Sequence, residues 1–431
     1  MHARTRNVGV VALVFVLAVA CGSDADLASP TSTTSPTSTS GSTETTAAAA
    51  STVATPAPTT MVEPSTVPDA PAVPFPIARF AAIRDEPVPD DLAAVFQAAL
   101  EDFAGSDDFG EGGGLTASVM SAAGTWSGTV GTADGVRDLQ VEDQFAIASI
   151  TKSVIAAQVM LMVEAGEIEL DDAVADHLPP DLQLQTNGAT IRQLLNHSSG
   201  FPDDWPVFEP LLRSDPLRVW SVAEVLERTP AARGDAGSSY EYSGTNYLLL
   251  GLMIEHVSGR PAVDVLREKV LAVGGIERLI LQPDEQPSEP IAMPRDAVVE
   301  SIGGYLPSLA SVTATQFPGG MASDAPSLAR WWRGLCAGEI VSEATLTEMA
   351  TADPGAIANG TYGLGLFDTT DGYSPGAIGH QGEALGYMSW AGCMPEEGAV
   401  VVVLTNRPVR ALTVEIFVGA LRPFVDALRL R

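Results

Sequence analysis

Lysine is almost absent from this sequence. Its 431 residues include 23 Lys+Arg, and only Lys152 and Lys269 are lysines. Arginine keeps its proton in proteins, so a chain that relies on arginine has few cations able to become neutral near pH 7. A lysine set in apolar surroundings is therefore a candidate for proton transfer.

Positive charge of either kind is also scarce. The 23 Lys+Arg stand against 54 Asp+Glu, which gives a formal net charge of -31. A strongly acidic surface repels nucleic-acid phosphates and anionic lipid surfaces. Nucleic acid is therefore not expected as a partner, and any contact with a membrane has to come from a separate anchor.

Cysteine and histidine are too few and too scattered for a metal site. The 3 cysteines and 5 histidines show no spacing typical of metal ligands, so neither a metal nor another cofactor is expected. Two of the cysteines, Cys336 and Cys393, lie late in the chain. In an exported protein they can form a disulfide, or they can be two buried small apolar residues, and the sequence leaves both open.

No apolar run is long enough to span a bilayer comfortably. The stretch from Val8 to Val19 follows Arg4 and Arg6, and this order is typical of a signal peptide. A signal peptide is therefore predicted over residues 1–20, and the protein is expected to be exported.

The segment after the signal peptide is predicted to be a lipid-anchored tether. Small residues precede Cys21 as in a lipoprotein cleavage site, which makes this cysteine the lipidated first residue; ordinary secretion, with cleavage near Ala20, is the alternative. Residues 21–76 are rich in Ser, Thr, Ala and Pro, with too few large apolar side chains to offset the entropy of ordering. We therefore expect a disordered tether that holds the protein at the extracytoplasmic face of the cell envelope, with the lipid as its only membrane contact.

Residues 77–431 are predicted to form one domain. Apolar residues are frequent enough for a large core, and no second linker interrupts them. The patterns predict a helix over 90–104, paired strands at 115–120 and 125–130, helical pieces between 170 and 300, strands at 384–393 and 399–405, and a closing helix over 414–428. This order predicts an α+β fold: strands from both chain ends share one antiparallel sheet flanked by helices, and the middle forms a mostly helical lobe.

One stretch places a hydroxyl nucleophile beside a lysine. In Phe145-Ala-Ile-Ala-Ser-Ile-Thr-Lys-Ser-Val154, Ser149 falls at or just before the start of an apolar helix, and Lys152 lies one turn further on the same face. A serine hydroxyl needs a base to take its proton, and a lysine in apolar surroundings beside the positive end of a helix can be neutral near pH 7. The tetrapeptide alone is a weak signal, because chance also produces it.

Two further elements follow in order and strengthen that signal. They are Tyr242-Ser-Gly244 and His380-Gln-Gly382. Together with Ser149-Ile-Thr-Lys152 they resemble the signature of the class C β-lactamase and D-alanyl-D-alanine carboxypeptidase superfamily of serine hydrolases. Segments similar to the same family occur in order at 194–201, 317–324, 362–366 and 401–406. The resemblance covers about residues 80–425, and several ordered matches are far more specific than one.

The resemblance implies roles for individual residues. Ser149 is expected to be acylated, and Lys152 and Tyr242 to share proton transfer, with a nearby cation lowering the pKa of the tyrosine. The backbone amides of Ser149 and Glu383 are expected to form the oxyanion hole. His380 is expected to bind the substrate carboxylate or to support Tyr242.

Two glycines belong to the same implied site. Gly382 is expected to let the substrate backbone approach its strand. Gly244 stands where the family has asparagine, so the side-chain amide that would bind a substrate's acylamino group is missing; Asn246 fits the following helix instead. Ester-cleaving relatives keep the nucleophile, the lysine and the tyrosine while varying the rest, so esterase activity is an option.

The sequence therefore predicts an exported serine hydrolase that works through an acyl-enzyme on Ser149. The expected substrate is the D-alanyl-D-alanine end of a peptidoglycan stem peptide, or the β-lactam that mimics it. A carboxylesterase acting on a small ester is the alternative with the same chemistry. A catalytically silent module that binds penicillin or the cell wall is the alternative of a different class.

Overall fold

The protein is seen in a computed structural model. It describes residues 73–429 except 107–108, 110–111, 183, 273, 275, 296–302, 353–361, 370–375 and 408–413, and the side chains of 414–421 are not described. The predictions for the signal peptide, for Cys21 and for nearly all of the tether lie outside the described residues. The first helix, α1 (Ile77–Ala81), begins where the domain was predicted to begin and buries Phe80.

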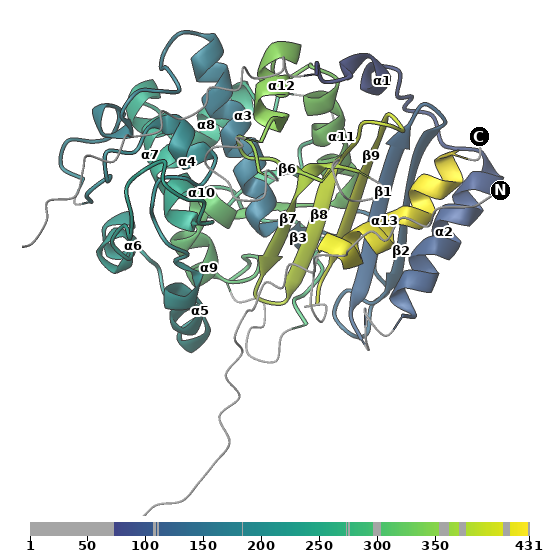
Figure 1. Cartoon of the computed structure of the whole chain (residues 1–431). Coiled ribbons are helices and arrows are strands. Elements are labelled where there is room, and N and C mark those ends of the chain that lie inside the picture. Colours follow the sequence, from purple (N-terminus) through teal and green to yellow (C-terminus); the bar gives the residue numbers. More distant parts are fainter. Residues whose placement is uncertain are drawn as a thin grey trace, which may run out of the picture. The chain divides into compact units, whose positions relative to one another are not determined.

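One six-stranded antiparallel sheet is built from both ends of the chain, in the order β2-β1-β9-β8-β7-β6 (Figure 1). Its strands are β1 (Gly114–Ser121), β2 (Gly124–Gly131), β6 (Phe367–Asp368), β7 (Ile378–Ala384), β8 (Tyr387–Met394) and β9 (Ala399–Thr405). β1 pairs with β9, so the early and late segments lie side by side. The predicted fold class, with a sheet made from both chain ends, is confirmed.

Each face of the sheet is covered by helices. They include α2 (Asp90–Ala104), α11 (Ala325–Cys336) and α13 (Val414–Arg429). Val401 of β9 packs in one core with Phe96 of α2 and Phe424 of α13, whereas its neighbour Val402 points into the larger core on the other face. Figure 1 shows α2 and α13 together on the outer face of β1 and β2. This alternation is what a strand with two covered faces requires.

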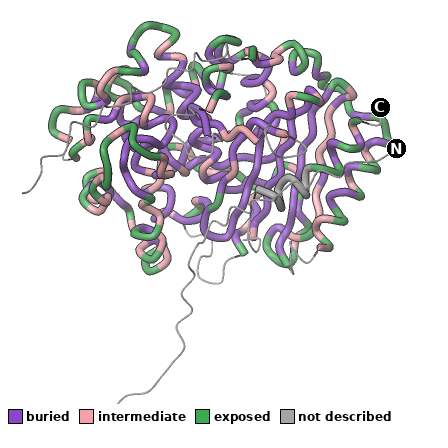
Figure 2. Tube along the Cα trace, viewed as in Figure 1, coloured by how far each residue is buried: buried purple, intermediate pink, exposed green. Residues whose placement is uncertain are grey.

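The middle of the chain forms the helical part that was predicted. Its helices are α3 (Thr151–Glu164), α4 (Ile191–Leu195), α5 (Trp205–Ser214), α6 (Val222–Arg228), α7 (Gly244–Ser258), α8 (Ala262–Glu268), α9 (Leu309–Ala314) and α10 (Gln316–Gly319), and α12 (Glu343–Ala350) follows α11. Most residues of α3 and α7 are buried, which explains why their sequences are apolar on nearly every side (Figure 2). Gly251 lets α10 pack closely on α7, because a Cβ there would lie 2.0 Å from the Phe317 ring.

Two local features differ from the prediction. The strand predicted over 384–393 is divided: β7 ends at Ala384, Gly386 turns the chain with φ +84°, and β8 begins at Tyr387. A small three-stranded sheet, in the order β3-β5-β4, was not predicted. Its strands are β3 (Phe145–Ala146), β4 (Ile280–Leu281) and β5 (Met321–Ser323).

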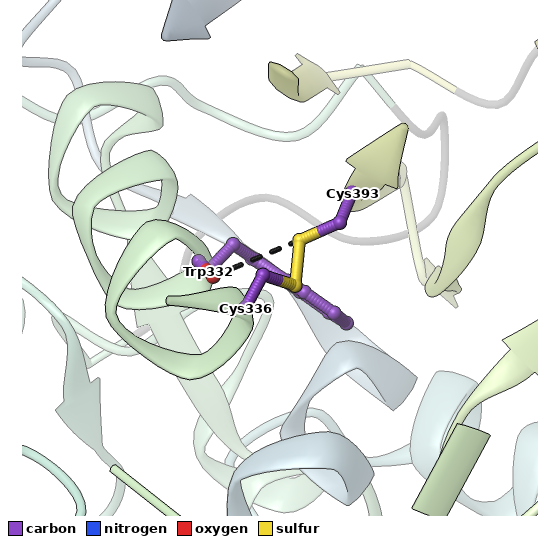
Figure 3. Close-up of a disulfide and its surroundings, with 3 residues drawn as sticks. All are labelled: Trp332, Cys336 and Cys393. Atoms are coloured by element: carbon purple, nitrogen blue, oxygen red, sulfur yellow. Dashed lines mark hydrogen bonds between the residues drawn. A yellow bond between two sulfur atoms is a disulfide. The ribbon is translucent and has the colours of Figure 1, made fainter. Parts of the chain in front are cut away.

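A disulfide ties the last turn of α11 to the sheet. Cys336 and Cys393 are joined, with their Cα atoms 6.7 Å apart, and the Cys393 Sγ lies 3.7 Å from the Trp332 carbonyl oxygen (Figure 3). Of the two alternatives left open by the sequence, the disulfide is the one present. Within the described part of the chain, no helix has both the length and the apolar character needed to cross a membrane.

Candidate active site

Ser149 lies in a short 3-10 turn that joins β3 to α3. The turn, η1 (Ala148–Ile150), begins with Ala148 at φ +46°, a left-handed conformation that alanine rarely adopts. Thr151 fixes the turn: its Oγ1 donates to the Ala148 carbonyl oxygen over 2.6 Å and accepts from the Met321 N–H over 3.1 Å. A distant segment, β5, therefore holds the nucleophile's backbone in place.

Lys152 lies in the first turn of α3 with its amine at the nucleophile. The lysine is 3% exposed, whereas Ser149 is partly exposed. The Lys152 Nζ lies 3.0 Å from the Ser149 Oγ and donates to the Pro318 carbonyl oxygen over 2.8 Å. The Pro318 contact holds one N–H, so the lone pair of a neutral amine can face Ser149.

Burial lowers the pKa of Lys152 to about 7. A charged amine loses its water shell inside the protein, and this loss favours the neutral form. The carboxylates of Asp204 and Asp203 oppose the effect, because they favour the charged form. A large fraction of the amine is therefore neutral at pH 7 and able to accept the Ser149 proton.

Tyr242, the third predicted catalytic residue, lies against the same amine. The Lys152 Nζ is 4.8 Å from the centre of its ring, and its hydroxyl shares a hydrogen bond with Ser149. Burial nevertheless raises the pKa of Tyr242 well above its ordinary value. The expected lowering by a cation is not found, because desolvation is the larger effect. Tyr242 is therefore a neutral phenol at pH 7, able to donate a proton but not to act as a resting base.

A buried histidine positions the segment that carries Tyr242. The His197 Nδ1 accepts the Ser243 N–H over 3.1 Å and lies 3.0 Å from the Asn246 Nδ2. Its ring centroid is 4.2 Å from that of Tyr242. Because Nδ1 accepts both hydrogen bonds, the ring proton sits on Nε2, and burial lowers the pKa of the ring so that it stays neutral. His197 therefore holds the tyrosine by contact rather than by charge.

His380 lies on β7 with its ring fully buried. The Nδ1 side faces the Gln381 carbonyl oxygen at 2.6 Å, so Nε2 accepts from the Tyr362 hydroxyl over 3.1 Å. Burial lowers the pKa of His380 to about 3, and the lysine's charge adds to the effect. An uncharged, buried ring argues against binding a substrate carboxylate. The placement favours the other predicted role, support of Tyr242, whose ring centroid lies 6.3 Å away.

Gly382 is needed for a contact within the protein. A Cβ at this position would lie 2.1 Å from the Ile147 carbonyl oxygen and 2.5 Å from the Ser389 Oγ. Ser389 also donates to that carbonyl over 2.9 Å. The space that was expected to admit a substrate is thus filled by the segment leading to Ser149, so Gly382 lets β7 pack against the nucleophile's turn.

The outer edge of β7 is open beside that contact. β6 pairs with β7 only at Gly379 and Ile378, so residues 380–384 have no strand neighbour on that side within the described residues. Glu383 belongs to this stretch, and its side chain is exposed. An open edge of this kind can take up a substrate backbone as an added strand. The role of the Glu383 amide in an oxyanion hole stays a prediction.

Several residues at the site were not singled out from the sequence. The carbonyl oxygen of Pro318 and the ring of Tyr362 belong to segments noted only as family matches. No motif pointed to Asp204, whose Oδ1 accepts the N–H of Gly244 over 3.1 Å. Within the described residues, no group of acidic, histidine or cysteine side chains is arranged to hold a metal.

Comparison with protein-family models identifies the family of the chain that carries this site. The family model described as Beta-lactamase matches residues 108–416, a range that contains Ser149, Lys152, Tyr242 and His380. The chain belongs to the Beta-lactamase family. The superfamily identified from the three sequence elements is thereby confirmed.

Relatives in this family carry several hydrolase names. The chain is 31% identical to a D-aminopeptidase of Brucella anthropi over 34% of its own length and 28% of the relative's, so it matches less than a third of that protein. Penicillin-binding protein 4 of Amycolatopsis lactamdurans is 27% identical over 65% of this chain and 76% of that protein. The solved structure of a D-stereospecific amidohydrolase from Streptomyces has a TM-score of 0.64 and 25% identity, covering 77% of this chain and 98% of the other.

Proposed function

We propose that this chain is a serine hydrolase that cleaves amide bonds through an acyl-enzyme on Ser149. The observation that carries the proposal is the 3.0 Å contact between the Lys152 Nζ and the Ser149 Oγ, made by an amine whose pKa burial lowers to about 7. A neutral amine at this distance can take the hydroxyl proton while the oxygen attacks the substrate carbonyl carbon.

Tyr242 completes the proton path. Attack forms the bond between the Ser149 Oγ and the carbonyl carbon and places the serine proton on Lys152. As the carbon–nitrogen bond breaks, the protonated Tyr242 gives its proton to the departing amine, and Lys152 returns one to the tyrosine. The amine leaves, Ser149 carries the acyl group as an ester, and both proton carriers are restored. Water then hydrolyses the ester.

The relatives support D-amino-acid amides as the substrate class. Two are named for action on D-residues, a D-aminopeptidase and a D-stereospecific amidohydrolase, and a third is named as a penicillin-binding protein. A small D-amino-acid amide, the D-alanyl-D-alanine end of a stem peptide and a β-lactam all present a carbonyl next to a D-configured or equivalent centre. We take this class as the substrate.

We further propose that the enzyme works outside the membrane, anchored by a lipid on Cys21. The signal-peptide pattern of residues 1–20 supports export. The disulfide between Cys336 and Cys393 also supports it, because such bonds persist in oxidising compartments outside the cytosol.

Ser149→Ala is expected to abolish turnover. With D-alanine p-nitroanilide as substrate, kcat/KM should fall by at least about 10³-fold, because the covalent route is lost. Ser153→Ala is the matched control: it removes a buried serine hydroxyl four residues after Ser149, which donates a 2.8 Å hydrogen bond to the Gly365 carbonyl oxygen. That control should keep kcat/KM within about tenfold of the wild type.

The substrate panel separates the candidate functions. Faster turnover of the D-anilide than of its L-enantiomer supports the proposal. Turnover of p-nitrophenyl butyrate without any amide turnover would establish the esterase instead. A stable penicillin adduct with neither activity would establish the binding module, and full activity in Ser149→Ala would exclude the mechanism.

A further inference from the structure

A carboxylate occupies the space beside Gly244. The Asp204 Oδ1 accepts the Gly244 N–H over 3.1 Å, and its Oδ2 accepts from the Thr245 hydroxyl over 2.9 Å. A Cβ on Gly244 would lie 2.8 Å from Oδ1 and 3.1 Å from Oδ2. The glycine and the aspartate are therefore complementary, since the side chain missing at 244 makes room for a carboxylate from the residue before α5.

This carboxylate lies close enough to the catalytic lysine to influence its charge. Asp204 is the largest electrostatic influence on Lys152, and Gly244 is two residues from Tyr242. No ion pair of the described residues includes Asp204, and Arg213 of the neighbouring helix pairs with Glu209 over 2.9 Å. When Lys152 is neutral, the carboxylate therefore has no ion-pair partner among the described residues, and burial raises its pKa above the ordinary value.

The hydrogen bonds that Asp204 accepts at the start of α7 do not explain why the residue there is negatively charged. The helix start uses two of the roughly four acceptor positions of the carboxylate, and an asparagine or serine would serve a helix start equally well. The charge also favours the protonated form of Lys152, which opposes the neutral form needed for catalysis. The Asp204 carboxylate is thus present despite its unfavourable effect on Lys152, and it has unused acceptor positions. Both features are suited to binding a cation.

We infer that Asp204 binds the ammonium group of the substrate's acyl-side amino acid. The inference rests on the proposed function. A free ammonium offers three donors to the unused acceptor positions of Asp204. An acylamino group has lost that charge, and its carbonyl oxygen meets a carboxylate where the family's asparagine would offer an N–H. The enzyme therefore selects amino-acid amides with a free amine over N-acylated peptides and over penicillins, which carry an acylamino group.

The test is a matched pair of substrates on the full chain. D-alanine p-nitroanilide and N-acetyl-D-alanine p-nitroanilide differ by one acetyl group, which removes the charge of the amine and adds an acyl carbonyl. The wild type should prefer the free amine by at least about tenfold in kcat/KM, as expected for a hydrogen bond between charged groups. Asp204→Asn keeps the shape and an oxygen for the Gly244 N–H, and it should reduce this preference by about tenfold or more.

Asp203→Asn is the control. It removes a neighbouring exposed carboxylate that influences Lys152 less, and it should leave the substrate ratio within about threefold. An unchanged ratio in Asp204→Asn, or a wild type that prefers the N-acetyl substrate, overturns the inference; the second readout needs no variant. Failure of the proposed function looks different, because neither anilide would then show turnover that depends on Ser149, whether or not p-nitrophenyl butyrate does.

Discussion

Replacing Lys152 with arginine is expected to reduce kcat/KM by at least about 10³-fold, within the range that removal of a general base produces. Arginine keeps the positive charge and a comparable length, but it cannot become neutral in the protein. The substitution therefore separates two roles that an alanine variant would remove together. If the lysine acts as a base, the arginine variant is inactive, and if it acts only through its charge, activity survives.

The chain supplies its own control for this prediction. Lys269 is the other lysine; it is exposed, with its amine 3.3 Å from a Glu268 carboxylate oxygen. Lys269→Arg makes the same chemical change at the surface, and its kcat/KM for D-alanine p-nitroanilide should stay within about twofold of the wild type. A Lys152→Arg enzyme as active as this control would leave the lysine no role as a base.

Gly382→Ala is expected to disable the site from the sheet side. The added Cβ would lie 2.1 Å from the Ile147 carbonyl oxygen, too close for β7 and the turn before Ser149 to keep their positions. Overpacking of this kind costs about 1–3 kcal/mol of folding stability. A displacement of about 1 Å at the reacting atoms can cost about 100-fold in rate. We therefore expect kcat/KM to fall at least about 100-fold and the melting temperature to fall with it.

A control variant shows whether replacing any glycine with alanine has the same effect as Gly382→Ala. A Cβ on Gly274 would meet nothing within 4 Å, so Gly274→Ala should change neither activity nor melting temperature measurably. Wild-type activity in Gly382→Ala would show that the contact between strand and turn does not position Ser149. If Gly382→Ala keeps the wild-type melting temperature but loses activity, the substitution acts only through the geometry of the active site.

Elements governed by local patterns were predictable from the sequence. The helix predicted over 90–104 has those bounds in the structure, because its apolar residues recur on one face and Gly105 follows. The early hairpin was also predictable, since apolar and polar residues alternate along most of its strands and a short turn joins Ser121 to Gly124. The meeting of both chain ends in one sheet followed from where the strands fall along the chain.

The break between β7 and β8 could not be seen in the same way. The sequence of β8 is apolar at nearly every position, so it lacks the alternation of polar and apolar residues that marks where a half-buried strand starts or ends. Leu385 and Ala384 are buried, and they make the turn as apolar as the strands beside it. The sequence marks this turn only with Gly386, which adopts a positive φ in the structure.

The electrostatics of the site also needed the fold. The pairing of Ser149 with Lys152 is local and was predictable from their spacing. The Pro318 carbonyl that holds the amine is 166 residues from it, and Asp204 reaches Gly244 across 40. The pKa of Tyr242 was predicted in the wrong direction, because a neighbouring cation can be inferred from a motif but the depth of burial cannot.

The most direct test of the central claim is the pH dependence of Ser149 acylation. The full chain is mixed with p-nitrophenyl butyrate, quenched at short times and analysed by intact mass and peptide mapping on both sides of pH 7. Because the pKa of Lys152 is lowered to about 7, the amine is protonated below this pH and neutral above it. The account predicts a butyryl group on Ser149 whose rate of formation rises through about pH 7 and then levels off. A butyryl group on another residue, or a rate on Ser149 that does not change across this range, would contradict it.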